Sequence, residues 1–256
     1  MKKLLPCLAA VSLVAAVLAI GGCGKKSPPP AATVAEAPAP LIDRELFFGD
    51  PEISGSQLSP DGKWLSFLKP HNGARNIWVK GADEPFTAAR PVTADKRPVP
   101  GYFWSRDGRY VLYVQDRDGD ENFHVWAVDP AGAPQGEANV PQARDLTPVP
   151  GVRAQILSMP RSLPDVMMVG LNERDPRFHD IYRVEIATGQ RKLVRENKEE
   201  VGAWVFDNEG QLRLAWKEKP GGGGDLLRVG LQGLEPIASA TFEEDITPLQ
   251  FHPDGR

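Results

Sequence analysis

The 256-residue chain has very little cysteine, and this scarcity limits how its fold can be held together. Its two cysteines, Cys7 and Cys23, both lie near the amino terminus, so the rest of the chain can build neither a disulfide framework nor a cysteine-based metal site. A chain of this length can bury a hydrophobic core without such cross-links. Packing and strand pairing must therefore stabilise the folded part.

Basic clusters and metal-binding histidine patterns are also scarce. The formal net charge is −4, and no lysine- or arginine-rich run follows residue 26, which argues against a nucleic-acid partner. The four histidines, His71, His124, His179 and His252, are scattered and show none of the spacings typical of a metal site. We therefore expect no cofactor and no metal, and we interpret the histidines as structural.

Glycine and proline, in contrast, are abundant. Each occurs 25 times, so together they make up about a fifth of the chain, against a typical value of about 12%. This content favours many short elements joined by turns over long helices. With 25% charged and 41% hydrophobic residues, the chain has the composition of a folded globular protein.

Residues 1–22 have the layout of an export signal. A short basic segment precedes an apolar run over residues 4–20, which is short for a membrane span. The run ends in Gly21-Gly22-Cys23, which resembles the lipobox of bacterial lipoproteins. This resemblance implies lipidation of Cys23 and a protein anchored to a membrane of the cell envelope, and Gly24 after the cysteine mildly favours the outer membrane. An ordinary cleaved signal peptide and an uncleaved anchor helix are the alternatives, and all three place the rest of the chain outside the cytoplasm.

Residues 23–41 are predicted to form a tether. The segment from residue 24 to residue 40 is rich in proline and alanine, and Val34 is its one large apolar residue. Such a composition favours an extended, poorly packed chain. The folded domain is therefore expected over residues 42–256.

That domain contains a repeat of roughly 45–51 residues. Turn-like segments of the Ser-Pro-Asp-Gly type recur at Ser59–Gly62, Ser105–Gly108, Asp207–Gly210 and His252–Gly255, with a degenerate copy near Leu163–Asp165. In such a turn the aspartate can hydrogen bond to nearby backbone and the glycine takes a positive φ. A large apolar residue stands four positions before each glycine, and an apolar stretch follows the first three turns. The pattern predicts strand, tight turn, strand.

Two further segments recur in every unit. The first covers Asn76–Val79, His124–Val128, Asp180–Val184 and Asp225–Val229. The second covers Arg90–Thr93, Arg144–Thr147, Arg191–Val194 and Glu235–Ala238. Four short strands per unit of about 45 residues are typical of a β-propeller blade. The sequence therefore predicts an all-β fold of four-stranded antiparallel blades, in which large side chains such as Trp104 and Phe206 pack between neighbouring blades.

The segment from Tyr102 to Val125, with its runs FWSRDGRYVLY and DRDGDENFHV, resembles the amino-terminal propeller of the prolyl oligopeptidase family of serine peptidases. Its dipeptidyl-peptidase and acylaminoacyl-peptidase branches are the most similar, and the resemblance covers about residues 42–256. It implies a propeller that gates or selects peptides above an α/β-hydrolase domain that carries the Ser-Asp-His triad. It also implies no catalytic residue in this chain, which contains no G-x-S-x-G nucleophile elbow.

The repeat period allows about four blades and the start of a fifth between residues 42 and 256, whereas propellers of this family have seven or eight. An open arc would expose edge strands that closed propellers protect. We therefore expect the chain to be part of a longer protein, with peptides or a protein as partner and a membrane contact through the lipid. The alternative is a non-enzymatic periplasmic propeller similar to TolB that binds a protein partner, because TolB-like propellers share the turn motif.

Two acidic segments allow a functional and a structural interpretation. Four oxygen-bearing side chains alternate with other residues in the second unit: Asp116, Asp118, Asp120 and Asn122. They suggest a calcium loop, but Gly119 comes two positions too early for an EF-hand and Ala127 replaces the bidentate glutamate. A solvated hairpin tip between two apolar strands is the favoured interpretation.

Glu199-Glu200 is similar to the paired glutamates with which dipeptidyl peptidases hold a substrate amino terminus, a charge-assisted contact. The distance to Gly210 is shorter than in that family and no helical insertion surrounds the pair, which favours a charged connector between blades. Ser56 lacks the glycines of a nucleophile elbow, and Gly221–Gly224 lacks the lysine of a phosphate loop. We interpret the first as structural and the second as a flexible hairpin loop.

Overall fold

The computed structural model describes residues 39, 41–49, 51–244, 246–249 and 251–252. The predicted export signal, Cys23 and most of the tether lie outside these residues. The chain divides into two compact units, residues 1–49 and residues 50–256. In the first unit the described residues form one short helix, α1 (Glu45–Phe48), whose first N–H, that of Glu45, donates to the Asp43 carboxylate. No helix in the described part of the chain is long and apolar enough to cross a membrane.

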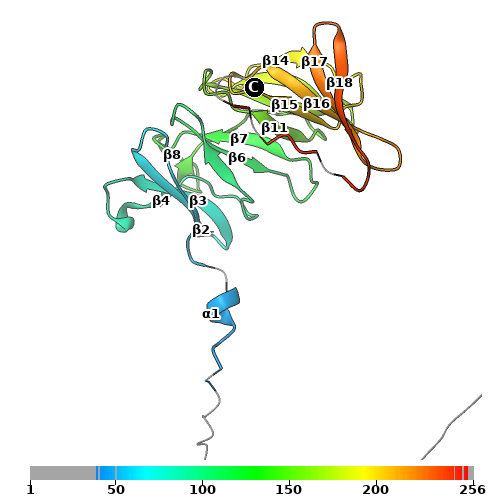
Figure 1. Cartoon of the computed structure of the whole chain (residues 1–256). Coiled ribbons are helices and arrows are strands. Elements are labelled where there is room, and N and C mark those ends of the chain that lie inside the picture. The colour runs from blue at the N-terminus through cyan, green and yellow to red at the C-terminus, as the bar shows by residue number, and fades with distance from the viewer. Residues whose placement is uncertain (1–38, 40, 50, 245, 250, 253–256) are drawn as a thin grey trace, which may run out of the picture. The chain divides into compact units, whose positions relative to one another are not determined.

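The second unit is all-β, as predicted (Figure 1). Within the described ranges its long strands form four antiparallel sheets of four strands each. The first sheet contains β1 (Ser54–Leu58), β2 (Trp64–His71), β3 (Ala74–Gly81) and β4 (Arg90–Pro91). The second contains β5 (Tyr102–Trp104), β6 (Val111–Gln115), β7 (His124–Val128) and β10 (Ala143–Asp145). The third contains β11 (Ala154–Ser158), β12 (Val166–Asp175), β13 (Phe178–Glu185) and β14 (Arg191–Arg195). The fourth contains β15 (Ala203–Phe206), β16 (Leu212–Glu218), β17 (Gly224–Gly230) and β18 (Gly233–Ala240).

In each four-stranded sheet every strand pairs with the next strand of the same sheet, so the order in the sheet follows the order in the chain. The two later segments that recur in the sequence fall on the third and fourth strands of each sheet, which confirms the prediction of a four-stranded repeat. The sequence did not predict helix α1, the 3₁₀ helix η1 (Phe86–Ala88) or the short hairpin of β8 (Pro134–Gln135) and β9 (Val140–Pro141).

The predicted turn chemistry is present between the first two strands of the second sheet. The Ser105 hydroxyl donates to Asp107 Oδ1 at 2.5 Å and accepts the N–H of Tyr110 at 2.9 Å. Asp107 Oδ1 also accepts the N–H of Arg109 at 3.1 Å, and Gly108 has a φ of +72°. The side chains thus replace backbone partners that a tight turn leaves open. Ser59 and Asp61 make the same contacts in the first sheet.

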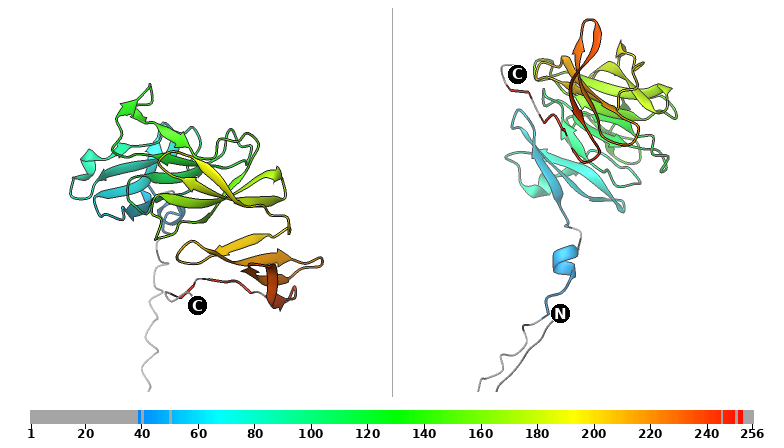
Figure 2. Two further views of the ribbon diagram at one scale, coloured as in Figure 1. Left: turned by 90° about the horizontal axis from the view of Figure 1, so that it is seen from above. Right: turned by 45° about the vertical axis from the view of Figure 1, so that its right-hand side comes forward.

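Apolar side chains form one core between each two consecutive sheets, and Figure 2 shows these sheets following one another. The core between the first two sheets includes Ile77, Val79, Val111, Tyr113 and Trp104. The next includes Leu112, Val125, Met167, Val169 and Leu171, and the last includes Ile181, Trp204, Ala215 and Leu227. Trp104 and Phe206 contact inter-sheet cores as predicted, whereas Leu58 at the matching position of the first sheet is 60% exposed.

Strand β6 contributes to two of these cores. Val111 and Tyr113 point into the core shared with the first sheet, and Leu112 and Val114 into the core shared with the third. Successive side chains of a strand point to opposite faces, so both faces of this sheet are buried. A middle sheet is therefore stabilised by both of its neighbours.

Candidate functional site

The connector between the third and fourth sheets, residues 196–202, carries the paired glutamates. It joins β14 to β15, so the prediction that Glu199 and Glu200 lie in a connector between blades is confirmed. Unlike a solvated loop, however, this connector is fixed at several points by buried side chains.

Asn197 closes the connector on itself. Its Nδ2 donates to the carbonyl of Val201 at 2.8 Å, and its Oδ1 accepts the N–H of Val201 at 2.9 Å. Asn197 is 2% exposed, and both hydrogen bonds are buried. Breaking these hydrogen bonds would leave buried polar groups without a partner, which costs free energy. The bridge therefore holds the loop in this conformation.

Asp180 and Arg174 attach the connector to the third sheet. Asp180 Oδ1 accepts the N–H of Asn197 at 2.7 Å, and its carboxylate receives two further hydrogen bonds from Arg174, at 2.9 and 2.8 Å. Arg174 also donates to the carbonyl of Asn197 at 2.8 Å. Burial alone would raise the pKa of Asp180, but the hydrogen bonds from Arg174 and Asn197 outweigh it and hold that pKa below its usual value. The carboxylate is therefore charged at neutral pH.

The two glutamates differ in exposure. Glu199 Oε1 accepts a hydrogen bond from Arg195 at 2.5 Å, and its Oε2 is buried without a hydrogen-bond partner among the described residues. Glu200 has a side chain 57% exposed and lies 3.6 Å from Arg177. Its φ of +56° is rare for a residue with a side chain and is often found at functional sites. The pair thus presents one partly buried and one accessible carboxylate.

A small cavity of about 170 Å³ lies beside this connector, between β11, β15 and the turn from β12 to β13. Arg177, His179 and Trp204 contribute to its lining, and the Trp204 indole donates to the carbonyl of His179 at 3.4 Å. Burial lowers the pKa of His179, and the positive charge of Arg153 lowers it further, so the imidazole is neutral at pH 7. The connector contributes Val201 and Gly202 to the lining, which contains no acidic side chain among the residues that the structure describes.

The alternating acidic residues occupy the loop between β6 and β7, the predicted hairpin tip. Its exposed part includes Asp118 and Asp120, but Asp116 is buried and accepts a hydrogen bond from Arg97 at 2.9 Å. Asp120 accepts the N–H groups of Arg117 and Asn122. Over the ranges that the structure covers, no three histidine, cysteine or acidic residues are placed to hold a metal ion.

His71, His124 and His179 lie on strands of three different sheets, and His252 lies beyond the last of these strands. His71 makes an edge contact with Trp78, and His124 Nδ1 lies 2.7 Å from Asp145 Oδ2 in the second sheet. Ser56 is an exposed residue of β1. Gly221–Gly223 form the turn between β16 and β17 with positive φ, as predicted for a hairpin loop, whereas Gly224, which was predicted to belong to this loop, is the first residue of β17.

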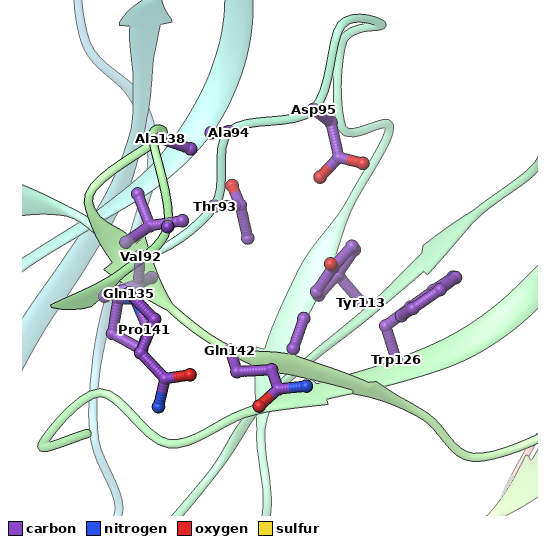
Figure 3. Close-up of a pocket in the computed structure, with 13 residues that line it drawn as sticks. Val92, Thr93, Ala94, Asp95, Tyr113, Trp126, Gln135, Ala138, Pro141 and Gln142 are labelled. Atoms are coloured by element: carbon purple, nitrogen blue, oxygen red, sulfur yellow. The ribbon is translucent and has the colours of Figure 1, made fainter. Parts of the chain in front are cut away.

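Sequence reasoning missed a second cavity of about 480 Å³ next to the second sheet (Figure 3). Asp95, Tyr113 and Trp126 line one side, and the β8–β9 hairpin, with Gln135 and Pro141, lines the other. The sequence does contain a signal for this cavity, the long segment from residue 129 to residue 142 between the third and fourth strands of the unit. The third and fourth units join the corresponding strands by short turns.

No family model matches the chain. Dipeptidyl aminopeptidase BIII of Pseudoxanthomonas mexicana is 39% identical over 209 residues, which are 81% of this chain and 29% of that protein. Dipeptidyl peptidase family member 6 of Caenorhabditis elegans is 32% identical over 184 residues, 71% of this chain and 24% of that protein. A structure from a study of two prolyl endopeptidases has a TM-score of 0.50 at 17% identity, over 73% of this chain and 28% of that one, and shows a shared fold. The chain thus spans less than a third of the length of these relatives.

Proposed function

We propose that this chain, a homologue of the dipeptidyl peptidases with the propeller fold of the prolyl oligopeptidase family, is the substrate-selecting part of an exported peptidase. The observation that carries the proposal is the 39% identity to a dipeptidyl aminopeptidase over 209 residues. In this proposal the four sheets are successive blades of a larger propeller. Peptide hydrolysis takes place in an α/β-hydrolase domain, since this chain has no nucleophile elbow.

Glu199 and Glu200 are proposed to bind the free amino terminus of a peptide. The Asn197 bridge and the Asp180–Arg174 pair support this role because they fix the connector before a ligand arrives, which lowers the entropic cost of binding. Glu200 offers an accessible carboxylate, and Glu199, whose side chain is 36% exposed, offers a second one beside it in the chain. An ammonium group has three donors and can contact both.

A chromogenic substrate tests this function. The polypeptide encoded by the complete gene should release the amino-terminal dipeptide from a dipeptidyl 4-nitroanilide, and should leave the amino-acetylated compound intact. Glu200→Gln should raise KM about tenfold or more with a smaller change in kcat, because it removes one charge-assisted contact of about 1.5–3 kcal/mol. Glu196→Gln, on the same connector but paired with Lys198, is the matched control.

The proposal fails if the complete gene product cleaves neither compound and its reading frame encodes no G-x-S-x-G elbow. A role in binding a protein partner, like that expected of a TolB-like propeller, would then replace it.

Export and lipid anchoring are proposed on the sequence of residues 1–23 alone. Cys23→Ser should abolish incorporation of labelled fatty acid in a bacterial host, and unchanged labelling would remove the lipid anchor from the proposal.

A further inference from the structure

The second sheet has a hairpin insertion that the other sheets lack. The first, third and fourth sheets link their last two strands through residues 82–89, 186–190 and 231–232, whereas the second uses residues 129–142, which include the β8–β9 hairpin. The repeat does not need this hairpin to complete its four strands. Its effect is to wall a cavity of about 480 Å³ against Tyr113 and Trp126, a size typical of ligand sites.

One acidic side chain lines this cavity, that of Asp95. Its backbone is fixed by Asn76, whose Oδ1 accepts the Asp95 N–H at 2.8 Å and whose Nδ2 donates to the Asp95 carbonyl at 3.0 Å. In the part of the chain that the structure covers, no basic side chain forms an ion pair with its carboxylate, and the neighbouring Arg97 is paired with Asp116 at 2.9 Å. Burial raises the pKa of Asp95, as expected for a carboxylate without a compensating charge.

Two aromatic rings lie below this carboxylate. Tyr113 and Trp126 are cross-strand neighbours on β6 and β7, and their ring centroids stack at 6.3 Å with planes 19° apart. Figure 3 shows the Asp95 carboxylate turned toward Tyr113, with Thr93 and Gln142 on the other sides of the space. A carboxylate above aromatic rings attracts cations and repels anions, and side-chain amides supply further hydrogen bonds.

We propose that this cavity binds an ammonium or guanidinium group, with Asp95 as its counter-ion and Trp126 as its aromatic wall. The group belongs either to a small amine or to a lysine or arginine side chain of a peptide. A bound cation supplies the charge partner that the half-buried Asp95 lacks, and the hairpin insertion supplies the wall that keeps the contact partly shielded from water. The site goes beyond the peptidase role, because the paired glutamates lie on another connector.

Calorimetric titration of the full chain tests the site with two cationic probes, agmatine and the capped tripeptide Ac-Ala-Arg-Ala-NH₂. We expect at least one of them to bind, and the ratio of the two affinities tells a small amine from a peptide side chain. Asp95→Asn should weaken this binding at least tenfold, because it keeps the shape of the side chain and removes its charge. The capped citrulline tripeptide, which is neutral, should bind at least tenfold more weakly than the arginine probe.

Asp118→Asn is the matched control, since it removes the same charge from the exposed tip of the same sheet. Thermal melts of both variants should coincide with that of the unchanged chain, because the hydrogen bonds between Asn76 and Asp95 use the backbone of Asp95. If Asp95→Asn does not fold, Trp126→Phe, which narrows the aromatic wall, should still weaken binding severalfold. Equal binding to Asp95→Asn and the unchanged chain, equal losses in Asp95→Asn and Asp118→Asn, or no binding of either cation would each overturn the proposal.

Discussion

His124 in the second sheet and Asp180 in the third stand at matching positions, each just before the apolar residues of a third strand. Both are buried and both form a polar contact toward the fourth strand or the segment after it. His124 pairs with Asp145, which in turn accepts the N–H of Thr147 at 2.9 Å. Asp180 instead accepts the N–H of Asn197, two residues beyond the end of the fourth strand.

The matching positions have the same structural role but use different side chains. In both sheets the position ties the third strand to the outgoing chain, but an imidazole reaches only its neighbouring strand, whereas a carboxylate joined by Arg174 holds the connector itself. Asn76 does the same task in the first sheet with an amide that contacts Thr93 and Asp95. The third sheet can therefore hold a connector that carries charged groups in one conformation.

The largest effect is expected from Asp180→Ala. It leaves the N–H of Asn197 without a partner and removes both hydrogen bonds from Arg174, so the free energy of unfolding should fall by about 2–4 kcal/mol. Urea denaturation measures this change. Asp175→Ala, which removes an exposed pair with Arg177, is the control and should cost about 1 kcal/mol or less. Equal losses in the two variants would mean that the connector does not depend on Asp180.

A smaller effect is expected from His124→Ala, about 1–2 kcal/mol, because Asp145 still accepts the Thr147 N–H and lies near Arg117. His124→Asn should recover part of this loss, since an amide does the same task at Asn76. If the asparagine variant were as unstable as the alanine variant in the same urea assay, the two positions would not be equivalent.

The smallest effect concerns pH. The pKa of Asp180 is lowered on folding, so its stabilising contribution is present above the unfolded value of about 3.9 and is lost as pH falls through the folded value. Between these two pH values the Asp180 carboxyl is protonated in the unfolded chain and still charged in the folded chain. Between pH 5 and pH 2.5 the urea midpoint should fall less steeply in Asp180→Asn than in the unchanged chain, and parallel curves would contradict the proposed network.

Much of the fold could be predicted because the repeat is local. Apolar segments after each turn mark strands, and the third unit was recovered from residues 180–194 although its turn motif had decayed. In the structure that connection uses a backbone hydrogen bond from Val166 to Leu163 instead of the serine and aspartate contacts. The β8–β9 hairpin was missed because strands of two residues have no detectable periodicity.

The candidate site was predicted less completely. Glu199 and Glu200 are adjacent in the sequence and are easily recognised as an acidic pair. Their position in a connector follows from the repeat. Arg174, Asp180 and Asn197 come from three segments whose contact depends on strand register, and each is an ordinary polar residue in the sequence. The cavity beside Asp95 is formed by the connector after the first sheet and by the hairpin insertion of the second sheet. These segments are far apart in the sequence, so no short stretch of sequence predicts the cavity.

The two buried faces of β6 have a consequence for how this strand finds its partners. In a sheet with one wet face, a slip by one residue is rejected because it turns polar side chains inward. On β6 such a slip would merely exchange Val111 and Tyr113 with Leu112 and Val114, apolar for apolar. The polarity of the side chains therefore does not distinguish the two alignments of β6. The different volumes of the side chains in the two cores and the hydrogen bonds of the Ser105–Asp107 turn at one end of the strand favour the observed one.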